Sequence, residues 1–202
     1  MRGLTVLQYG PVGAIVECEA GSALALAQAL MDTRRFREVV PAEQSVLLLL
    51  PVGMTRSELE GIVDSLPEEL PRFVGRDVEV PVLYDGADLA LVAEATHLSV
   101  AEVVAIHSGT TYLAAFSGFA PGYVYCTGLD ERLRLPRRPS PRTVVPAGSV
   151  AIADAYAAIY PTASPGGWHL LGHTDLTLFD LNRPEPALIQ PGDRVRYTVR
   201  NS

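Results

Sequence analysis

The stretch Gln190-Pro-Gly-Asp-Arg-Val-Arg-Tyr-Thr-Val-Arg200 shows most directly how this chain folds. Its first four residues are typical of a turn, because proline fixes φ and glycine and aspartate accept turn conformations. After the turn, Val195, Tyr197 and Val199 fall on one face of an extended chain, and the arginines and Thr198 fall on the other. This alternation predicts a strand with one buried face.

Other short β-type runs, separated by proline and glycine turns, fill the C-terminal part of the chain. The clearest are Thr143 to Ala153 and Leu176 to Asp180. Many short strands with turn signals favour a β-barrel or sandwich. Two predicted helices precede them, Asp88 to His97 and Ser99 to Ser108, and the second opens with a capping box, Ser99-Val-Ala-Glu102.

The N-terminal part mixes strands and helices. Leu4 to Tyr9, Val12 to Glu17 and Ser45 to Leu50 are predicted strands, and Ser22 to Arg35 is an alanine- and leucine-rich helix. A second helix is expected to start at the capping box Thr55-Arg-Ser-Glu58. The sequence therefore predicts an α+β chain with two domains, residues 1–78 and residues 79–202, the second carrying the two leading helices.

Composition excludes several function classes. The chain has 202 residues, a net charge of -7, and sixteen basic residues that are all arginine. An acidic chain does not attract nucleic acid or an anionic membrane as a whole, and the predicted helix pair has no arginine with which to approach DNA phosphate. Without lysine there is no Schiff-base or P-loop lysine. No apolar run reaches the ~20 residues of a membrane span and no signal peptide opens the chain, so a cytoplasmic location is expected.

An aromatic loop, Phe116-Ser-Gly-Phe-Ala-Pro-Gly-Tyr-Val-Tyr125, is the first candidate for function. Such a loop can bring backbone amides to a ligand and surround it with rings. It can equally be a tight barrel corner that is packed by its own aromatic residues.

A second candidate is the proline-rich segment Leu135 to Ser149, which contains Arg137, Arg138 and Arg142. Guanidinium groups on a stiff backbone are suited to carboxylate or phosphate recognition. The alternative is a solvated charged loop that pairs with Asp130 and Glu131. Five arginines between residues 132 and 142 of an acidic chain favour an anion site or an interface.

The histidines give weaker evidence of a functional site. His169 and His173 are spaced four apart, but Pro165-Gly-Gly and Gly172 disfavour the helix on which both rings could bind one metal ion. In a strand the two residues would lie ~13 Å apart, so no metal site is predicted. His107 ends the second predicted helix, where it can act as a C-terminal cap or as a general base.

Several motifs carry a resemblance to a known family. In chain order they are Gly118-Phe-Ala-Pro-Gly122, Gly128-Leu-Asp-Glu-Arg132, Pro136-Arg-Arg138, Pro141-Arg-Thr-Val-Val-Pro-Ala-Gly-Ser-Val-Ala-Ile152, Ile159-Tyr-Pro161, Ser164-Pro-Gly-Gly-Trp168 and Pro191-Gly-Asp-Arg-Val195. Together they resemble the B subunit of 5-oxoprolinase, also called allophanate hydrolase subunit 1, a family that includes the sensor-kinase inhibitor KipI. The resemblance is strong over the C-terminal two thirds and weak before it.

The resemblance implies a fold and an activity. It implies a small N-terminal α/β sandwich-like domain followed by a cyclophilin-like β-barrel, which pairs with the barrel of the enzyme's C subunit and works with its A subunit. This complex opens the lactam of 5-oxoproline to glutamate and hydrolyses ATP, expected with Mg²⁺, and the chain is expected to be inactive alone. The alternatives are a KipI-like inhibitor of histidine-kinase autophosphorylation, and a carboxyltransferase or allophanate hydrolase component that would need a biotin-carrying partner.

The resemblance also implies site residues. Arg138 and Arg142 would hold phosphate or the substrate carboxylate, the amides of Gly166 and Gly167 would form an anion nest, and His107 would transfer protons. The substrate or ATP site as a whole would comprise Phe119, Pro121, Gly122, Arg138, Arg142, Tyr160, Gly166, Gly167, Trp168, His169 and His173.

The chain departs from the family pattern at two places. Ala153-Asp-Ala-Tyr-Ala-Ala158 replaces a glycine-rich turn, which would block the approach of backbone to a ligand there. His169 and His173 stand where relatives carry glutamine and arginine, so the charge at position 173 is expected to depend on pH.

Overall fold

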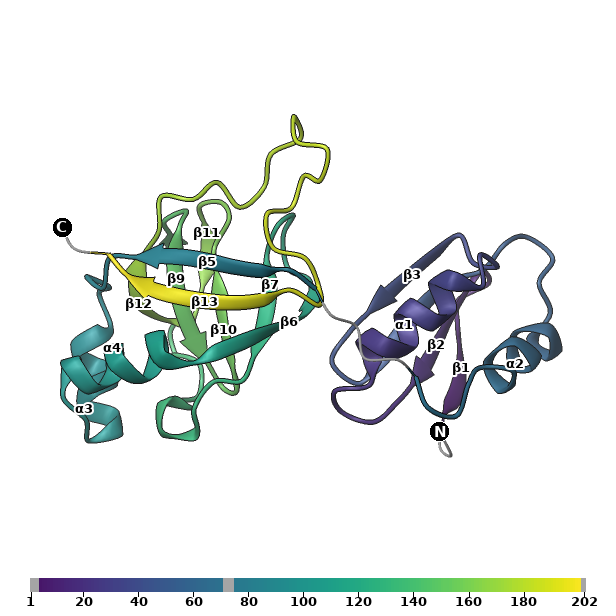
Figure 1. Cartoon of the computed structure of the whole chain (residues 1–202), viewed down its shortest axis with the longest axis horizontal. Coiled ribbons are helices and arrows are strands. Elements are labelled where there is room, and N and C mark those ends of the chain that lie inside the picture. The colour runs from purple at the N-terminus through teal and green to yellow at the C-terminus, as the bar shows by residue number, and fades with distance from the viewer. Residues whose placement is uncertain (1–3, 71–74, 201–202) are drawn as a thin grey trace. The chain divides into compact units, whose positions relative to one another are not determined.

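The computed structural model describes residues 4–70 and 75–200, and the chain divides between Val74 and Gly75 into two compact units (Figure 1). Both units are mixtures of helix and strand. This agrees with the predicted α+β class, and the second unit contains the expected barrel-like sheet.

The N-terminal unit is one antiparallel sheet with two helices. The strands, in spatial order, are β1 (Thr5–Tyr9), β2 (Gly13–Glu17), β4 (Ser45–Leu49) and β3 (Glu38–Pro41), and the helices are α1 (Ala23–Asp32) and α2 (Arg56–Asp64). Apolar side chains of the central strands, such as Val16 and Leu48, are buried in one cluster with Leu26 and Leu59 of the helices. The predicted capping box at the start of α2 is confirmed, with Thr55 and Glu58 bonding each other's backbone amides.

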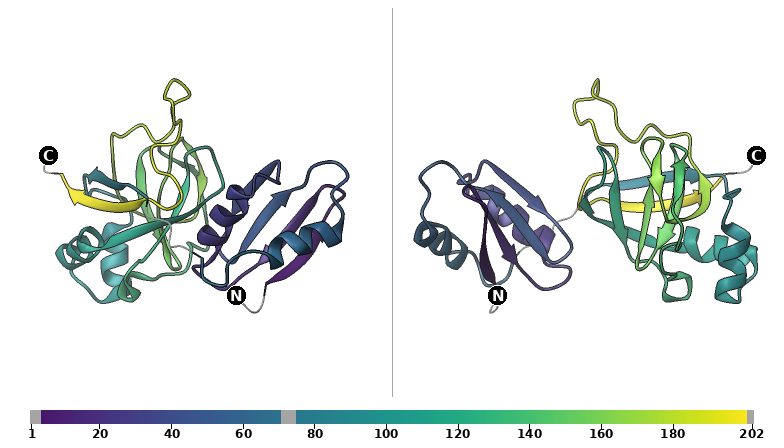
Figure 2. Two further views of the ribbon diagram at one scale, coloured as in Figure 1. Left: turned by 45° about the vertical axis from the view of Figure 1, so that its right-hand side comes forward. Right: turned by 180° about the vertical axis from the view of Figure 1, so that it is seen from behind.

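The C-terminal unit is a seven-stranded sheet that curls almost into a barrel (Figure 2). In spatial order its strands are β12 (His169–His173), β9 (Ser149–Ala153), β10 (Tyr156–Ile159), β7 (Val124–Thr127), β6 (Thr111–Ser117), β13 (Arg194–Val199) and β5 (Asp77–Val82). The sheet closes where Leu83, just after β5, exchanges two backbone hydrogen bonds of 2.9 Å with His173 of β12. A small separate pair, β8 (Arg142–Val145) with β11 (Ser164–Gly166), lies outside this sheet.

The strand predicted after the Gln190 turn is confirmed as β13, which lies between β5 and β6. Val195 and Tyr197 are fully buried, and Arg194 and Arg196 face outward. Val199, on the predicted apolar face, is 53% exposed because it ends the strand.

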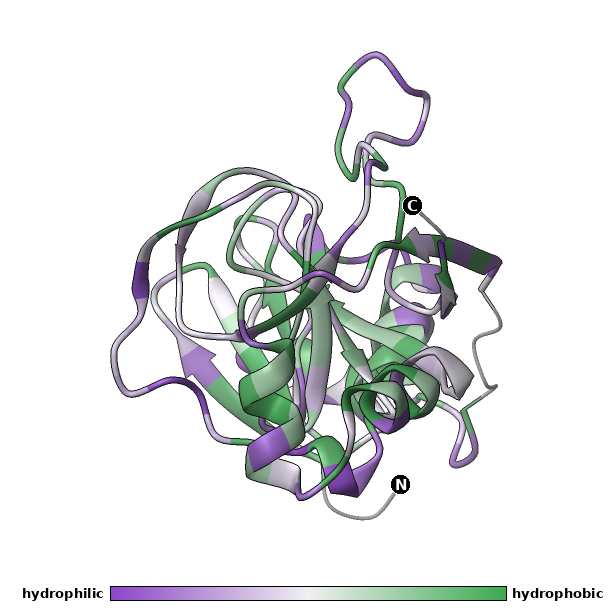
Figure 3. Cartoon of the chain, turned by 90° about the vertical axis from the view of Figure 1, so that its left-hand side faces the viewer, coloured by the Kyte–Doolittle hydropathy of each residue, from purple (hydrophilic) through white to green (hydrophobic). Residues whose placement is uncertain are grey.

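Two other strand predictions need correction. Thr143 to Ala153 forms two strands, because the chain turns at Pro146-Ala-Gly148 between β8 and β9, and Gly148 adopts φ 79°. Leu176 to Asp180 is not a strand. It belongs to a long excursion between β12 and β13 that has only the isolated bridge Phe179–Ala187. Figure 3 shows mainly hydrophilic residues at the tip of this excursion, whereas Leu178 of the predicted run is buried in the barrel core without belonging to a strand.

Helices α3 (Leu89–Thr96) and α4 (Val100–Gly109) follow β5, as predicted. His97 ends α3 in the left-handed conformation, and the predicted capping box of Ser99 and Glu102 starts α4. Within residues 4–70 and 75–200, no single helix is long and apolar enough to cross a membrane. Together α3 and α4 meet the criterion by length and composition only, and they bend by 95° at their junction.

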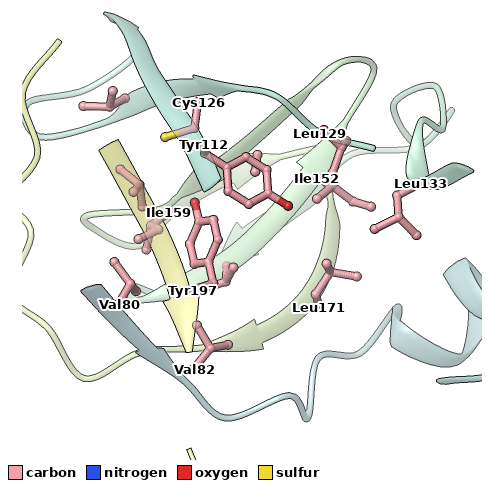
Figure 4. Close-up of a cluster of buried hydrophobic side chains, with 14 of the residues drawn as sticks. Val80, Val82, Tyr112, Cys126, Leu129, Leu133, Ile152, Ile159, Leu171 and Tyr197 are labelled. Carbon is pink, nitrogen blue, oxygen red and sulfur yellow. The ribbon is translucent and has the colours of Figure 1, made fainter. Parts of the chain in front are cut away.

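The barrel interior is filled by apolar and aromatic side chains from nearly every strand (Figure 4). Tyr112 of β6 and Tyr197 of β13 meet edge to face at 5.1 Å between ring centroids, close to the buried thiol of Cys126. The short η1 helix (Glu131–Leu133) inserts Leu133 into the same cluster. The interior is therefore a packed core, and ligand sites must be sought on the surface of the unit.

Candidate functional site

A small pocket of about 70 Å³ opens at the surface of the C-terminal unit. Its walls come from the loop between β6 and β7, from β7, from the proline-rich segment before β8, and from the residues around β11. The lining residues are Phe119, Tyr123, Tyr125, Arg137, Tyr160, Pro165, Gly166, Gly167 and Trp168. The structure thus places five of the predicted site residues around one pocket, namely Phe119, Tyr160, Gly166, Gly167 and Trp168.

Tyr123 organises the aromatic walls of the pocket. Its ring meets those of Phe119, Tyr125, Tyr160 and Trp168 in edge-to-face contacts, with centroids 5.1 to 5.9 Å apart. Four of the five rings are at least half-buried, whereas Phe119 is 61% exposed. Phe119 is therefore the ring of this group that is placed to contact an incoming molecule.

The two glycines of the pocket do not form the anion nest that the resemblance implies. A nest needs successive amides in alternating right- and left-handed conformations, but neither Gly166 nor Gly167 has a positive φ. Gly166 instead ends β11 and pairs with Arg142 of β8. Its missing side chain makes room for Tyr160, because a Cβ at Gly166 would overlap the Tyr160 hydroxyl.

The arginines of the proline-rich segment point in different directions. Arg137 lines the pocket, with its guanidinium 5.8 Å from the centre of the Trp168 ring and 3.6 Å from the carboxylate of Asp154. Arg138 and Arg142 do not line the pocket. Their side chains meet Asp88 instead. Neighbouring residues of an extended segment face opposite ways, which explains why Arg137 and Arg138 separate.

Asp88 is buried beneath Arg138 and Arg142. One oxygen, Oδ1, accepts a hydrogen bond of 2.6 Å from Arg138 Nη1 and another of 2.6 Å from Arg142 Nη2. The other oxygen, Oδ2, accepts the backbone amide of Leu170 at 2.8 Å. Burial raises the pKa of Asp88, but the hydrogen bonds from Arg142 and Leu170 and the charges of both arginines outweigh it, so the pKa lies below its usual value. Asp88 is therefore ionised at neutral pH.

The remaining predicted residues lie outside the pocket. His169 is buried, with Nε2 2.9 Å from the carbonyl oxygen of Pro136, and His173 pairs with Asp85 at 2.8 Å. Pro121 is exposed at the turn of the Phe119 loop, and Gly122, with φ 80°, packs against Phe179 and Leu178. The turn that replaces the family's glycine-rich segment is the hairpin between β9 and β10.

His107 lies in the barrel core, which corrects its proposed catalytic role. It is 0% exposed, its Nδ1 is 2.8 Å from the Tyr84 hydroxyl, and its ring packs against Tyr112 and Tyr197. Burial lowers its pKa to about 3, so the imidazole is neutral. Because the ring has no exposed surface, the structure assigns it to packing.

Sequence reasoning did not select four residues that the structure places at these sites: Asp88, Tyr123, Tyr125 and Arg137. Both tyrosines lie in the aromatic loop Phe116 to Tyr125, which was a candidate as a whole. The aromatic residues of that loop carried the signal. Successive side chains of an extended segment point to opposite sides, and this alternation could have shown that Arg137 and Arg138 face different ways. Asp88 carried no such signal, because its partners are 50 or more residues away.

Replacing Gly166 with alanine tests the packing of the pocket. The new methyl group would displace the Tyr160 ring, which is nearly fully buried and contacts Phe119 and Tyr123. We expect a loss of about 1–3 kcal/mol in the free energy of unfolding, as for other overpacked sites, together with changed fluorescence of Trp168, the only tryptophan. Gly109→Ala is the matched control, because a Cβ there meets nothing within 4 Å. Equal stability of both variants would show that Tyr160 is not held against Gly166.

Comparison with known proteins places this fold in a family. Residues 5–189 match the family model described as "Carboxyltransferase domain, subdomain C and D". The chain is 43% identical over 178 residues to the B subunit of 5-oxoprolinase from Escherichia coli O157:H7, covering 85% of this chain and 82% of the relative. It is 37% identical over 180 residues to the protein of the same name from Bacillus subtilis (strain 168), covering 80% and 75%.

Solved structures agree with this placement. The crystal structure of TTHA0988 matches with a TM-score of 0.83 and 38% identity, covering 94% of this chain but only 40% of the TTHA0988 chain. PH0987 from Pyrococcus horikoshii matches with a TM-score of 0.61 and 32% identity over 98% of both chains. The K. lactis urea amidolyase, at 18% identity and a TM-score of 0.71, shares the fold. The chain therefore belongs to the carboxyltransferase subdomain C and D family, in the group that contains the B subunit of 5-oxoprolinase.

Proposed function

We propose that this chain is one component of an ATP-dependent 5-oxoprolinase, which opens 5-oxoproline to L-glutamate. The observation that carries the proposal is the pocket of Phe119, Arg137, Tyr160 and Trp168, which combines aromatic walls with one guanidinium group on a chain that matches proteins named as the B subunit of 5-oxoprolinase. Aromatic faces suit a small ring, and a guanidinium group suits a carboxylate. The pocket therefore suits one end of 5-oxoproline, which has both.

The chemistry explains why ATP is needed. The lactam amide is stabilised by resonance and resists attack by water. Transfer of the γ-phosphoryl group of ATP to the lactam oxygen would leave ADP and make the ring carbon electrophilic. Water would then add to that carbon, the ring C–N bond would break as the nitrogen takes a proton, and a second water would release phosphate, giving glutamate. ATP, with Mg²⁺, is therefore part of the proposal.

The small size of the pocket supports the need for a partner. Ligand pockets usually enclose about 300–1,000 Å³, several times the volume found here. This chain also matches only 40% of the TTHA0988 chain. We propose that the enzyme's C subunit supplies the opposite wall, that its A subunit completes the complex, and that the chain alone has no activity. A cytoplasmic location fits these soluble substrates.

The two alternative functions have less support. A KipI-like inhibitor of a histidine kinase would need no ligand pocket, and the relatives above carry the name of an enzyme component. A component that uses carboxybiotin remains compatible with the fold of the urea amidolyase, but it would need a biotin-carrying partner because this chain has no lysine.

The test is glutamate formation by the reconstituted complex. The chain would be coexpressed with the A and C subunits of the same source, and glutamate formation would be measured with and without ATP. Arg137→Ala is expected to lower kcat/KM for 5-oxoproline at least about tenfold, as expected for the loss of one charge-assisted hydrogen bond. Arg196→Ala is the matched control, because both side chains are more than half exposed and each pairs loosely with one carboxylate. A purified complex that forms no glutamate, or one in which Arg137→Ala changes nothing, would contradict the proposal.

A further inference from the structure

Two arginines of the proline-rich segment share a single carboxylate oxygen. Arg138 Nη1 and Arg142 Nη2 each lie 2.6 Å from Asp88 Oδ1, so these two nitrogens can be no further apart than twice that distance. The backbone holds the same arrangement, because the Arg138 amide donates to the Gly167 carbonyl and Arg142 pairs with Gly166. Two like charges are thus fixed close together by one buried anion.

The charges in this group do not balance. Asp88 supplies one negative charge and the arginines supply two positive charges, which leaves one positive charge without a partner in the group. Arg138 Nε and Arg142 Nη1 are buried and have no hydrogen-bond partner. Native proteins pair nearly all such donors, so each unpaired donor calls for an explanation.

The group is open to solvent on one side. The side chain of Asp88 is 3% exposed, whereas those of Arg138 and Arg142 are 28% and 22% exposed. The carboxylate therefore lies beneath two arginine side chains that are partly exposed. An ion that arrives from solvent meets the arginines before it meets the carboxylate.

We propose that Arg138 and Arg142, held together by Asp88, form a binding site for one oxyanion that is separate from the aromatic pocket. Two adjacent guanidinium groups present several N–H donors to the oxygens of one carboxylate or phosphate, and such charge-assisted bonds are the strong ones. Binding a monoanion would neutralise the remaining positive charge. It would also give the guanidinium groups a second acceptor, which Asp88 alone does not provide.

This inference rests on the proposed function for the identity of the oxyanion. A 5-oxoprolinase has two sources, the carboxylate of 5-oxoproline and a phosphate group of ATP, and both offer the same oxygen chemistry. The aromatic pocket with Arg137 and the Asp88 site would then hold different parts of the reacting molecules.

The experiment follows the Nε–Hε signals of the arginine side chains by NMR in the full chain without partners. The chain is titrated with inorganic phosphate and, separately, with 5-oxoproline, while sodium chloride keeps the ionic strength constant. We expect saturable shifts of the Arg138 and Arg142 signals with at least one of the two ligands. The ligand that binds more tightly identifies the source of the oxyanion.

Variants assign the site. Arg142→Gln and Arg138→Gln, which each keep an amide donor for Asp88, are expected to weaken binding at least about tenfold, and the backbone spectrum reports whether each variant folds. Arg194→Gln removes a guanidinium from the exposed pair with Asp77 and should leave binding unchanged. The absence of saturable shifts with either ligand, or shifts of equal size with chloride, would overturn the site. The titration measures binding and not glutamate formation. Failure of the binding site and failure of the proposed activity can therefore be told apart.

Discussion

Asp88→Ala is expected to lower the free energy of unfolding of the C-terminal unit by about 3–5 kcal/mol, the range seen when one partner of a buried ion pair is removed. The carboxylate is buried and is the shared acceptor of Arg138 and Arg142, and it also accepts the Leu170 amide. Its loss would leave two guanidinium groups and one backbone amide of β12 without an acceptor. Urea unfolding followed by Trp168 fluorescence measures the loss.

The control for Asp88→Ala is Asp77→Ala. Asp77 also accepts two hydrogen bonds from an arginine, Arg194, but both side chains are exposed, and exposed pairs contribute less than about 1 kcal/mol. A difference of several kcal/mol between the two variants is therefore expected. If Asp88→Ala costs as little as Asp77→Ala, the buried carboxylate does not hold the arginines in place. Adding phosphate should restore part of the lost stability, because an oxyanion can replace the missing carboxylate.

Local patterns in the sequence predicted the features that depend on neighbours along the chain. The alternation from Arg194 to Val199 predicted β13, and the two capping boxes predicted the starts of α2 and α4. The same rules were wrong for Leu176 to Asp180, because a short apolar run needs a neighbouring strand before it can join a sheet. They also merged β8 and β9, whose separation depends on the turn at Gly148.

The candidate site depended on contacts that a sequence does not display. Motif resemblance selected segments whose residues line the pocket, but it could not say which side chains of a segment face the same way. Arg137 faces the pocket, whereas Arg138 faces Asp88, which lies 50 residues earlier. His107 was chosen from its place near the end of a helix, and burial among three tyrosines could be seen only once β6 and β13 were brought together.

The buried His107 is expected to make the stability of the C-terminal unit depend on pH in mildly acidic solution. Burial lowers its pKa to about 3, whereas an unfolded histidine titrates near about 6.5. Between these values the unfolded chain binds a proton that the folded chain does not bind. The free energy of unfolding therefore falls as the pH is lowered from about 6.5, by up to about 1.4 kcal/mol per pH unit, and the total loss by pH 3 is on the order of 4 kcal/mol.

His107→Leu should remove this contribution, because leucine fills the same core without binding a proton. Urea unfolding between pH 5 and pH 6.5 isolates it, since most carboxyl groups titrate below that range. Val103→Ala is the matched control: Val103 is fully buried in the same helix, so its truncation lowers stability at every pH but keeps the slope. The same slope in His107→Leu and in the parent chain would mean that the ring takes up protons while folded. A lost slope would instead show that the ring stays neutral among Tyr84, Tyr112 and Tyr197, and a ring that cannot be protonated in the folded chain cannot transfer protons to a substrate.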